Sequence, residues 1–153
     1  MLFFYYFCIG FGKNKATMKT IQELNALTPA TLMGHFSIHF TAIGADFIGA
    51  EMPVDERTLQ PFGRMHGGAA IALAESVASA GSWAILDDER TAVVGSEVSA
   101  SHVGAARAGS TVIAAGKLVH RGRLHHVWEV TIKTQDNKPV SLCRITNTII
   151  TTP

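Results

Sequence analysis

The stretch MHGGAAIALAESVASAGS, residues 65–82, carries one carboxylate, Glu75, among apolar and small residues. A carboxylate is costly to bury in its charged form unless it has a partner. Glu75 is therefore a structural residue with a hydrogen-bond partner, an exposed side chain, or a group held for catalysis. In a catalytic site it would act as a general base or as a nucleophile. The residue type alone leaves these interpretations open.

A second feature with possible chemistry is the run His66, Gly67 and Gly68 at the start of the same stretch. If a helix begins here, its first backbone N–H groups are free and lie at the positive end of the helix dipole. Such a helix start can hold a carbonyl oxygen or an oxyanion. Glycine also lets a ligand approach the main chain. An ordinary glycine-rich helix entry is the alternative.

One helix over about residues 67–86 is predicted to position these groups, because the stretch is rich in alanine, lacks proline and is too long for a strand. Glu75 and Ser79, one turn apart, can reach a common water. A membrane-spanning helix is disfavoured because the run contains Ala, Gly and Ser rather than Leu. The helical period places small and polar residues on one stripe, which a ligand can approach: Gly68, Ala72, Glu75, Ser79 and Ser82. A second stripe is predicted to face a sheet: Leu73, Val77, Ala80 and Ala84.

The distance between Gly67 and Glu75 limits how they can cooperate. Eight residues of helix separate them by about 12 Å, so one carbonyl group cannot contact both. If both serve one reaction, they come from two chains whose helices lie antiparallel across a twofold axis. The spacing therefore predicts a homodimer with two composite sites.

The rest of the chain predicts an α+β fold. Residues 20–27 read as a short helix, and residues 28–34 as a second one with Thr28 as N-cap and Gly34 as its end. His35 and His39 are expected on one face of the first strand, and His125 and His126 on opposite faces of a later one. Short turns after the long helix predict antiparallel pairing of neighbouring strands. The predicted strands are residues 35–44, 46–54, 91–104, 110–122, 125–135 and 139–152, with a polar loop over 55–66.

Composition limits the class of protein. The chain has 153 residues, 47% hydrophobic and 16% charged, and its net charge is +1. One domain is expected, with some surface buried against another copy, and nucleic-acid binding is disfavoured. Cys8 and Cys143 have neither metal nor disulfide-framework spacing, which fits a cytoplasmic protein. No metal site is expected, since the histidine pairs lack a carboxylate or cysteine at ligand spacing.

Residues 1–17 differ from the remainder. Their first twelve residues are apolar and aromatic, too short to span a bilayer, and the positive charges follow this run instead of preceding it. We interpret 1–17 as an extension and 18–153 as the domain, without stable membrane association. A membrane anchor is the alternative.

The segment QPFGRMHGGAAIALAESVAS, residues 60–79, resembles the active-site segment of hot-dog-fold acyl-CoA thioesterases. It is most similar to the PaaI-like branch related to the Arthrobacter-type 4-hydroxybenzoyl-CoA thioesterase. The resemblance runs from about Met18 to the C-terminus and is strong again at GKLVHRGRLHHVWEVTI. It implies a long central helix wrapped by a six-stranded, largely antiparallel sheet. It also implies a homodimer, often doubled to a tetramer, with sites shared between chains.

The resemblance assigns roles to five residues. Glu75 matches the catalytic carboxylate, and Gly67 matches the residue whose N–H polarises the thioester carbonyl. His66 and Gln60 match polar residues that position the carbonyl and the departing thiolate. Ser79 matches a hydroxyl thought to orient the water.

Coenzyme A contacts are implied at the second segment. Arginine pairs well with phosphate, although a solvated hairpin turn is the alternative. A further group, where this chain has serines in place of the family's frequent asparagines, would lie near the acyl and pantetheine channel. The coenzyme A segment contains His120, Arg121, Gly122, Arg123 and His125, and the group near the channel contains Ser99, Ser101 and His102.

The expected function is hydrolysis of a small aromatic or medium-chain acyl-CoA to the free acid and coenzyme A, with no cofactor. The spacing favours hydrolysis, but two alternatives remain. One is a hot-dog hydratase or dehydratase acting on acyl thioesters. The other is a non-catalytic acyl-CoA-binding module.

Overall fold

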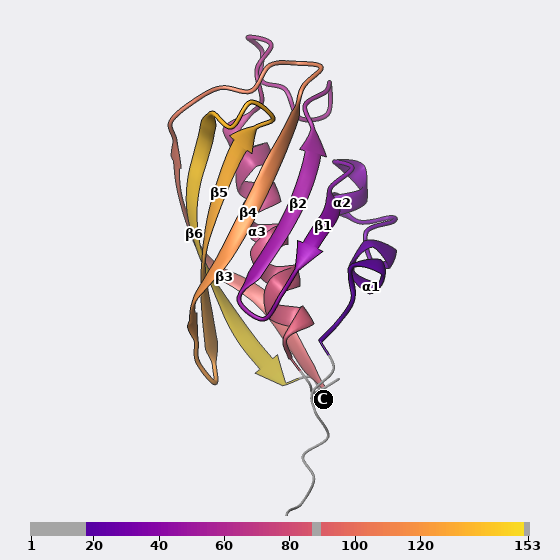
Figure 1. Ribbon diagram of the computed structural model, residues 1–153, viewed down its shortest axis with the longest axis vertical. Coiled ribbons are helices and arrows are strands. Elements are labelled where there is room, and N and C mark those ends of the chain that lie inside the picture. The colour runs from indigo at the N-terminus through magenta and orange to yellow at the C-terminus, as the bar shows by residue number, and fades with distance from the viewer. Residues whose placement is uncertain (1–17, 87–89, 152–153) are drawn as a thin grey trace, which may run out of the picture.

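The computed structural model describes residues 18–86 and 90–151 (Figure 1). The predicted extension over residues 1–17, with Cys8, lies outside the described residues.

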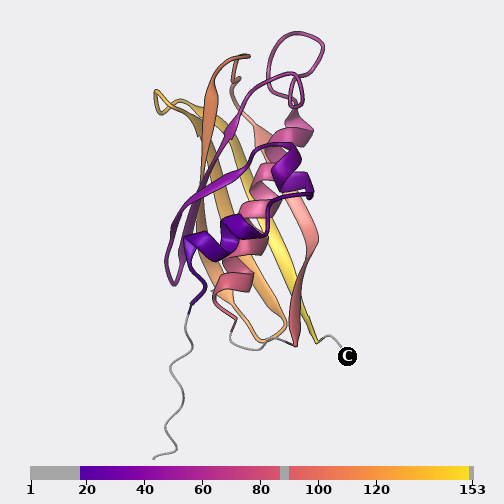
Figure 2. The ribbon, with the colours of Figure 1, turned by 90° about the vertical axis from the view of Figure 1, so that its right-hand side faces the viewer.

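Within the described part of the chain, six strands form one antiparallel sheet and a long helix packs against it (Figures 1 and 2). The α+β architecture expected from the sequence is therefore confirmed. The elements are α1 (Ile21–Ala26), α2 (Leu32–His35), β1 (His39–Ile43), β2 (Phe47–Pro53), α3 (Gly67–Ala84), β3 (Thr91–His102), β4 (Thr111–Arg121), β5 (His125–Thr134) and β6 (Pro139–Thr151).

The strand order is β1-β2-β4-β5-β6-β3, with every pair antiparallel. The predicted direction is right, but the pairing of β3 with the next strand in sequence, β4, is wrong. The segment between them does not form a hairpin because it is fixed to two other places. The Val103 N–H donates to the Val140 carbonyl of β6, and the Gly109 N–H donates to the carbonyl of Val54, which follows β2. The segment thus crosses the end of the sheet, and β3 pairs with β6 alone.

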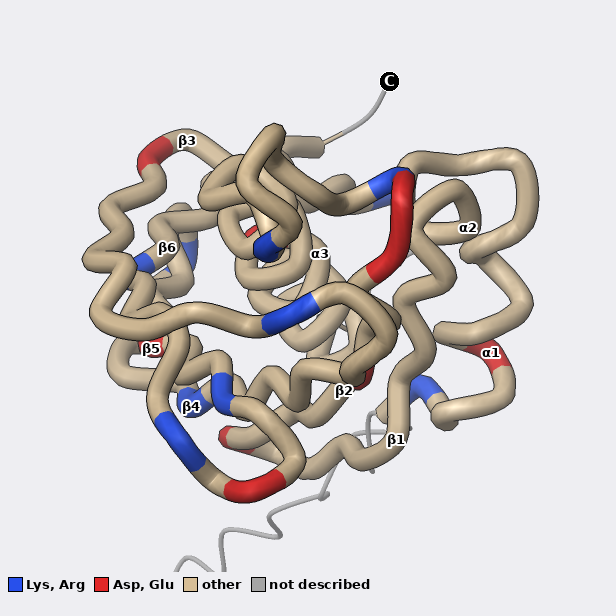
Figure 3. Tube along the Cα trace, turned by 90° about the horizontal axis from the view of Figure 1, so that it is seen from above, with Lys and Arg blue, Asp and Glu red and all other residues tan. Residues whose placement is uncertain are grey.

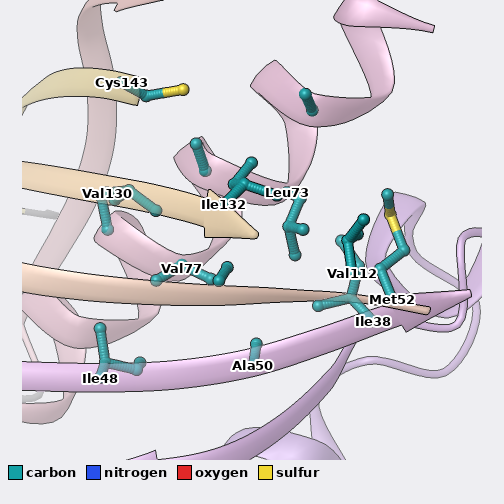
Figure 4. Close-up of a cluster of buried hydrophobic side chains, with 14 of the residues drawn as sticks. Ile38, Ile48, Ala50, Met52, Leu73, Val77, Val112, Val130, Ile132 and Cys143 are labelled. Atoms are coloured by element: carbon teal, nitrogen blue, oxygen red, sulfur yellow. The ribbon is translucent and has the colours of Figure 1, made fainter. Parts of the chain in front are cut away.

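The core lies between α3 and the sheet. Leu73 and Val77 of α3 face Ile48, Val130 and Ile132 of the strands, and all five are fully buried (Figure 4). Burying such side chains stabilises the fold by about 1.5–3 kcal/mol each. This packing holds α3 against the sheet.

Two residues of the predicted helix stripes differ from expectation. Ala80, expected against the sheet, is only half-buried and lines a cavity. Ser82, expected on the small polar stripe, is fully buried because its Oγ accepts a hydrogen bond from Trp128 Nε1 at 2.8 Å. The face of α3 that meets the sheet is thus rotated towards Ser82 relative to the prediction.

The alternation expected in β5 is confirmed. Trp128, Val130 and Ile132 are buried, while Glu129 is exposed. His125 and His126 point to opposite faces, and His126 is the buried one.

The first helices match the prediction only in part. Thr20 caps α1 through a capping box with Glu23, as the pattern suggests. The cap of α2 is Thr31 and not Thr28, because Ala30 adopts a left-handed φ of 59° and separates Thr28 from the helix. Gly34 lies inside α2, and His35 is its last residue, so His35 does not share a strand face with His39.

Charged residues of both signs are spread over loops, strands and helices, as the view along the long axis shows (Figure 3). In the part of the chain that is described, no helix is long and apolar enough to cross a membrane.

Candidate active site

A cavity of about 520 Å³ lies beside α3. Glu75 and Ser79 contribute polar groups to a lining that is otherwise mainly apolar. Its walls come from α1, α2, β1, α3 and the first residues of β3, and the larger apolar members are Leu24, Leu27, Leu32, Met33, Phe40 and Trp83. The cavity therefore suits an apolar group whose reactive end reaches the carboxylate.

Glu75 is half-buried, and its carboxylate packs against the backbone of β3 at Gly95. A Cβ on Gly95 would lie 3.0 Å from Glu75 Cδ and closer still to Oε1. Only a residue without a side chain leaves this space. The sequence prediction did not include Gly95, since nothing near it in sequence identifies its neighbour.

A β-bulge places Gly95 on the inner face. Gly95 pairs with Asn147 and Glu97 pairs with Thr146, so Ser96 is an extra residue on β3. The bulge reverses the side-chain alternation. Both Gly95 before it and Val98 after it therefore face α3, in line with their buried partners on β6.

Ser79 is tied to the core by a chain of side-chain hydrogen bonds. Its Oγ donates to Asn147 Oδ1 at 3.2 Å. Asn147 Nδ2 donates to Ser82 Oγ at 3.0 Å, and Trp128 Nε1 donates to that same oxygen. Asn147 and Ser82 are fully buried. The sequence prediction included Ser79 but neither buried partner.

The start of α3 forms a second group of polar atoms. His66 is the N-cap, and its Nδ1 accepts a hydrogen bond from the Gly68 N–H at 2.8 Å. Nδ1 is therefore unprotonated, and the ring presents its N–H at Nε2. Among the hydrogen bonds of the described residues, the Gly67 N–H has no acceptor. This start thus combines one free backbone donor with one imidazole donor.

His102 and Gln60 also lie near the start of α3. His102 Nε2 packs on Gly67, where a Cβ would be 2.6 Å from it, and His102 Nδ1 is 3.0 Å from Ser141 Oγ. Gln60 Oε1 accepts from the Phe62 N–H at 2.6 Å in the loop that leads to the helix. Its amide group remains able to donate.

The structure separates the predicted site residues of one chain into two groups. Glu75 and Ser79 line the cavity, whereas Gln60, His66 and Gly67 are not among its lining residues. This separation agrees with the helical distance between Gly67 and Glu75. Ser99 is exposed and borders a hollow on the outer face of the sheet, and Ser101 is also exposed on β3.

The predicted coenzyme A segment lies at the other end of α3. Arg121 donates from Nη2 to the carbonyl of Ile85, the C-cap of α3, at 2.8 Å. A bulge between Leu118 and His120 turns Arg121 towards the helix. His120 and Arg123 are exposed, and Gly122 closes the turn through its N–H to the His125 carbonyl.

His126 is buried near this end of the molecule, and its Nδ1 has no partner within the described residues. Burial lowers its pKa below the ordinary value, and the nearby Arg121 and His120 lower it further. The ring is therefore held neutral. It was not among the predicted site residues.

Comparison with known proteins places these features in a family context. The model of the thioesterase superfamily matches residues 62–141. The 1,4-dihydroxy-2-naphthoyl-CoA hydrolase of Escherichia coli K12 is 40% identical over 131 residues, covering 86% of this chain and 95% of that protein.

Solved structures give the same result. The crystal structure of a thioesterase from Haemophilus influenzae has 38% sequence identity and a TM-score of 0.82, covering 89% of this chain and 94% of that chain. A mutant thioesterase from Pseudomonas aeruginosa has 35% identity and a TM-score of 0.83, covering 87% of this chain and 95% of that chain.

Proposed function

The chain belongs to the thioesterase superfamily and is a thioester hydrolase with the hot-dog fold, and from this premise we propose that it hydrolyses a small aromatic or medium-chain acyl-CoA. The products are the free acid and coenzyme A. Glu75 is the catalytic carboxylate in this proposal. The observation that carries it is the position of Glu75 and Ser79 on the wall of an apolar cavity of about 520 Å³.

The cavity supports the choice of acyl group. Its apolar wall, with Phe40 and Trp83, favours a ring or a medium aliphatic chain over a charged group. The E. coli relative is named for an aromatic acyl-CoA. We therefore place the acyl group in the cavity, with the thioester carbon beside Glu75.

Two routes use Glu75. As a general base, it takes a proton from water while the water oxygen bonds to the thioester carbon and the π electrons move to the carbonyl oxygen. Collapse breaks the C–S bond, and the thiolate leaves with the electron pair and receives the proton from Glu75. As a nucleophile, Glu75 bonds to the carbon, the thiolate leaves, and water hydrolyses the resulting anhydride. Both routes use only residues of the chain, without a cofactor or metal.

The carbonyl oxygen gains charge in both routes and needs donors. The Gly67 N–H and the His66 Nε2–H supply them at the positive end of the α3 dipole. Because one chain holds these groups away from its own Glu75, we propose that two chains related by a twofold axis build each site. Gln60 adds an amide donor from the loop beside the helix start.

The coenzyme A arm carries phosphates that need exposed cations. Arg121 and Arg123 are both exposed, but Arg121 is engaged with the Ile85 carbonyl through Nη2. We therefore favour Arg123 for the phosphate contact, with His120 and His125 beside it.

A thiol-release assay with a panel of acyl-CoA thioesters tests this function. The panel should contain acetyl, hexanoyl, benzoyl and phenylacetyl thioesters, each assayed with the parent and with Glu75→Gln. We expect release of coenzyme A from the larger members and a loss of about 100-fold or more in the variant, with substrate binding retained. Binding without thiol release by the parent would indicate an acyl-CoA-binding module. In a separate absorbance assay with an enoyl-CoA, hydration of its double bond without thiol release would indicate a hydratase.

A further inference from the structure

Asn147 connects the wall of the cavity to the interior of the protein. It lies on β6, fully buried, and faces α3 between Ser79 and Ser82. These two serines are three residues apart and therefore share one side of the helix. Its backbone pairs with Gly95, the residue that makes room for Glu75. One β3–β6 residue pair thus meets both Glu75 and Ser79.

The Asn147 amide has its nitrogen towards Ser82 and its oxygen towards Ser79. The indole N–H of Trp128 can only donate, and it donates to Ser82 Oγ. Asn147 Nδ2 donates to the same oxygen, which directs Oδ1 towards Ser79. The hydroxyl proton of Ser79 is therefore given to Asn147.

This assignment decides what Ser79 can offer to the cavity. With its proton committed to Asn147, Ser79 presents only lone pairs on the cavity side. A water between Glu75 and Ser79 then donates one proton to each, and its own lone pair is left for the thioester carbon. A freely rotating hydroxyl would instead donate to that water or to Glu75, and so would compete for the electron pairs the reaction uses.

We propose that Asn147 is a positioning residue that keeps Ser79 as a hydrogen-bond acceptor and thereby orients the hydrolytic water. The proposal rests on the function proposed above, because it concerns the same site. Asn147 itself does not touch the substrate.

The test compares three variants in the thiol-release assay with the panel substrate that the parent turns over fastest. Asn147→Leu keeps the side-chain volume but removes the acceptor. Asn147→Asp keeps an oxygen facing Ser79 and, when protonated, a donor facing Ser82. Thr146→Val, a neighbouring β6 residue outside the site, is the matched control.

We expect Asn147→Leu to lower kcat by about 10- to 100-fold with KM changed by less than about threefold. Asn147→Asp should retain kcat within about threefold of the parent, and Thr146→Val should match the parent. If the acceptor acts through Ser79, a Ser79→Ala/Asn147→Leu double variant should be no slower than Ser79→Ala.

Several results would overturn the proposal. These are an Asn147→Leu enzyme as fast as the parent, an Asn147→Asp enzyme as slow as Asn147→Leu, or losses that multiply in the double variant. If Asn147→Leu does not fold, as judged by circular dichroism, the rate of Asn147→Asp decides alone. A parent that hydrolyses none of the panel thioesters would instead contradict the proposed function.

Discussion

The Glu75 carboxylate lies over the Cα of Gly95, in the space that any side chain on that residue would fill. Glu75 comes from the middle of α3 and Gly95 from β3, which follows α3 after a connection of six residues. Glu75 can therefore take this position only because Gly95, on the facing strand β3, has no Cβ.

Gly95→Ala should lower activity without unfolding the protein. The added methyl overlaps the Glu75 carboxylate, which has to leave its position against β3. A misplacement of about 1 Å can cost an aligned catalytic group on the order of 100-fold in rate. We therefore expect kcat to fall by about 10- to 100-fold. The measurement is steady-state thiol release. Gly49→Ala on β2 is the control, since a methyl there meets its neighbours at 3.3 Å or more. Equal activity of both variants would show that Glu75 is not held against β3.

Mixing two inactive variants should restore activity if the sites are composite. Glu75→Gln removes the carboxylate, and His66→Ala removes the imidazole donor at the helix start. A hybrid dimer contains one intact site and one site with both changes. Random reassociation should recover about a quarter of the parental activity, as twofold symmetry requires. The assay is thiol release after unfolding and joint refolding, with each variant refolded alone as control. No recovery would place both groups in one chain.

Filling the cavity should change acyl preference. Ala80 is a small residue of α3 on the cavity wall, and Ala80→Leu adds volume there. We expect kcat/KM for benzoyl-CoA to fall by about 10- to 200-fold relative to acetyl-CoA. Ala115→Leu, on the exposed face of β4, should leave the ratio unchanged. A constant ratio in Ala80→Leu would place the acyl group elsewhere.

The two arginines of the β4–β5 turn should separate in their effects. Arg123→Ala removes an exposed cation and should raise KM with little change in stability. Arg121→Ala removes the hydrogen bond to the Ile85 carbonyl and should lower the free energy of unfolding by about 1 kcal/mol. Urea denaturation and thiol-release kinetics measure the two quantities. The opposite pattern would assign the phosphate contact to Arg121.

Stability should depend on pH through His126. Burial lowers the pKa of this histidine in the folded state, so the unfolded chain binds a proton more readily. Above the unfolded value of 6.5 both states are neutral, and the residue makes no pH-dependent contribution. As the pH falls below 6.5, the unfolded state is favoured and stability decreases.

Denaturant unfolding between pH 8 and pH 5 checks this, with His126→Leu as the test and His39→Gln as the exposed control. The leucine variant should lose less stability on acidification than the parent. An identical loss in both would assign the effect to other groups.

Local patterns allowed much of the fold to be predicted. The boundaries of α3 and the alternation of β5 follow from short-range periodicity, which the chain shows clearly. The same patterns identified Glu75 and the helix start. The cap of α2 was misplaced because Thr28 and Thr31 are equally good N-caps, and only the backbone at Ala30 distinguishes them.

The roles of Gly95 and Asn147 could not be predicted in this way. Their neighbours on α3 are 20 or more residues away in sequence, and the pairing of β3 with β6 brings them together. Local patterns do not specify that pairing, and the bulge at Ser96 cannot be located from alternation alone. The contacts that Gly95 and Asn147 make with the α3 residues of the site therefore depend on tertiary structure.

The bulge at Ser96 divides β3 into two segments of opposite phase. The segment with Gly95 and the segment with His102 can both face α3 only because one residue is added between them. Removing any single residue between these positions would leave the composition almost unchanged, yet it would turn His102 away from Gly67. Over this strand, the number of residues is thus as strict a requirement as their identity, and homologous chains should vary here by substitution and not by length.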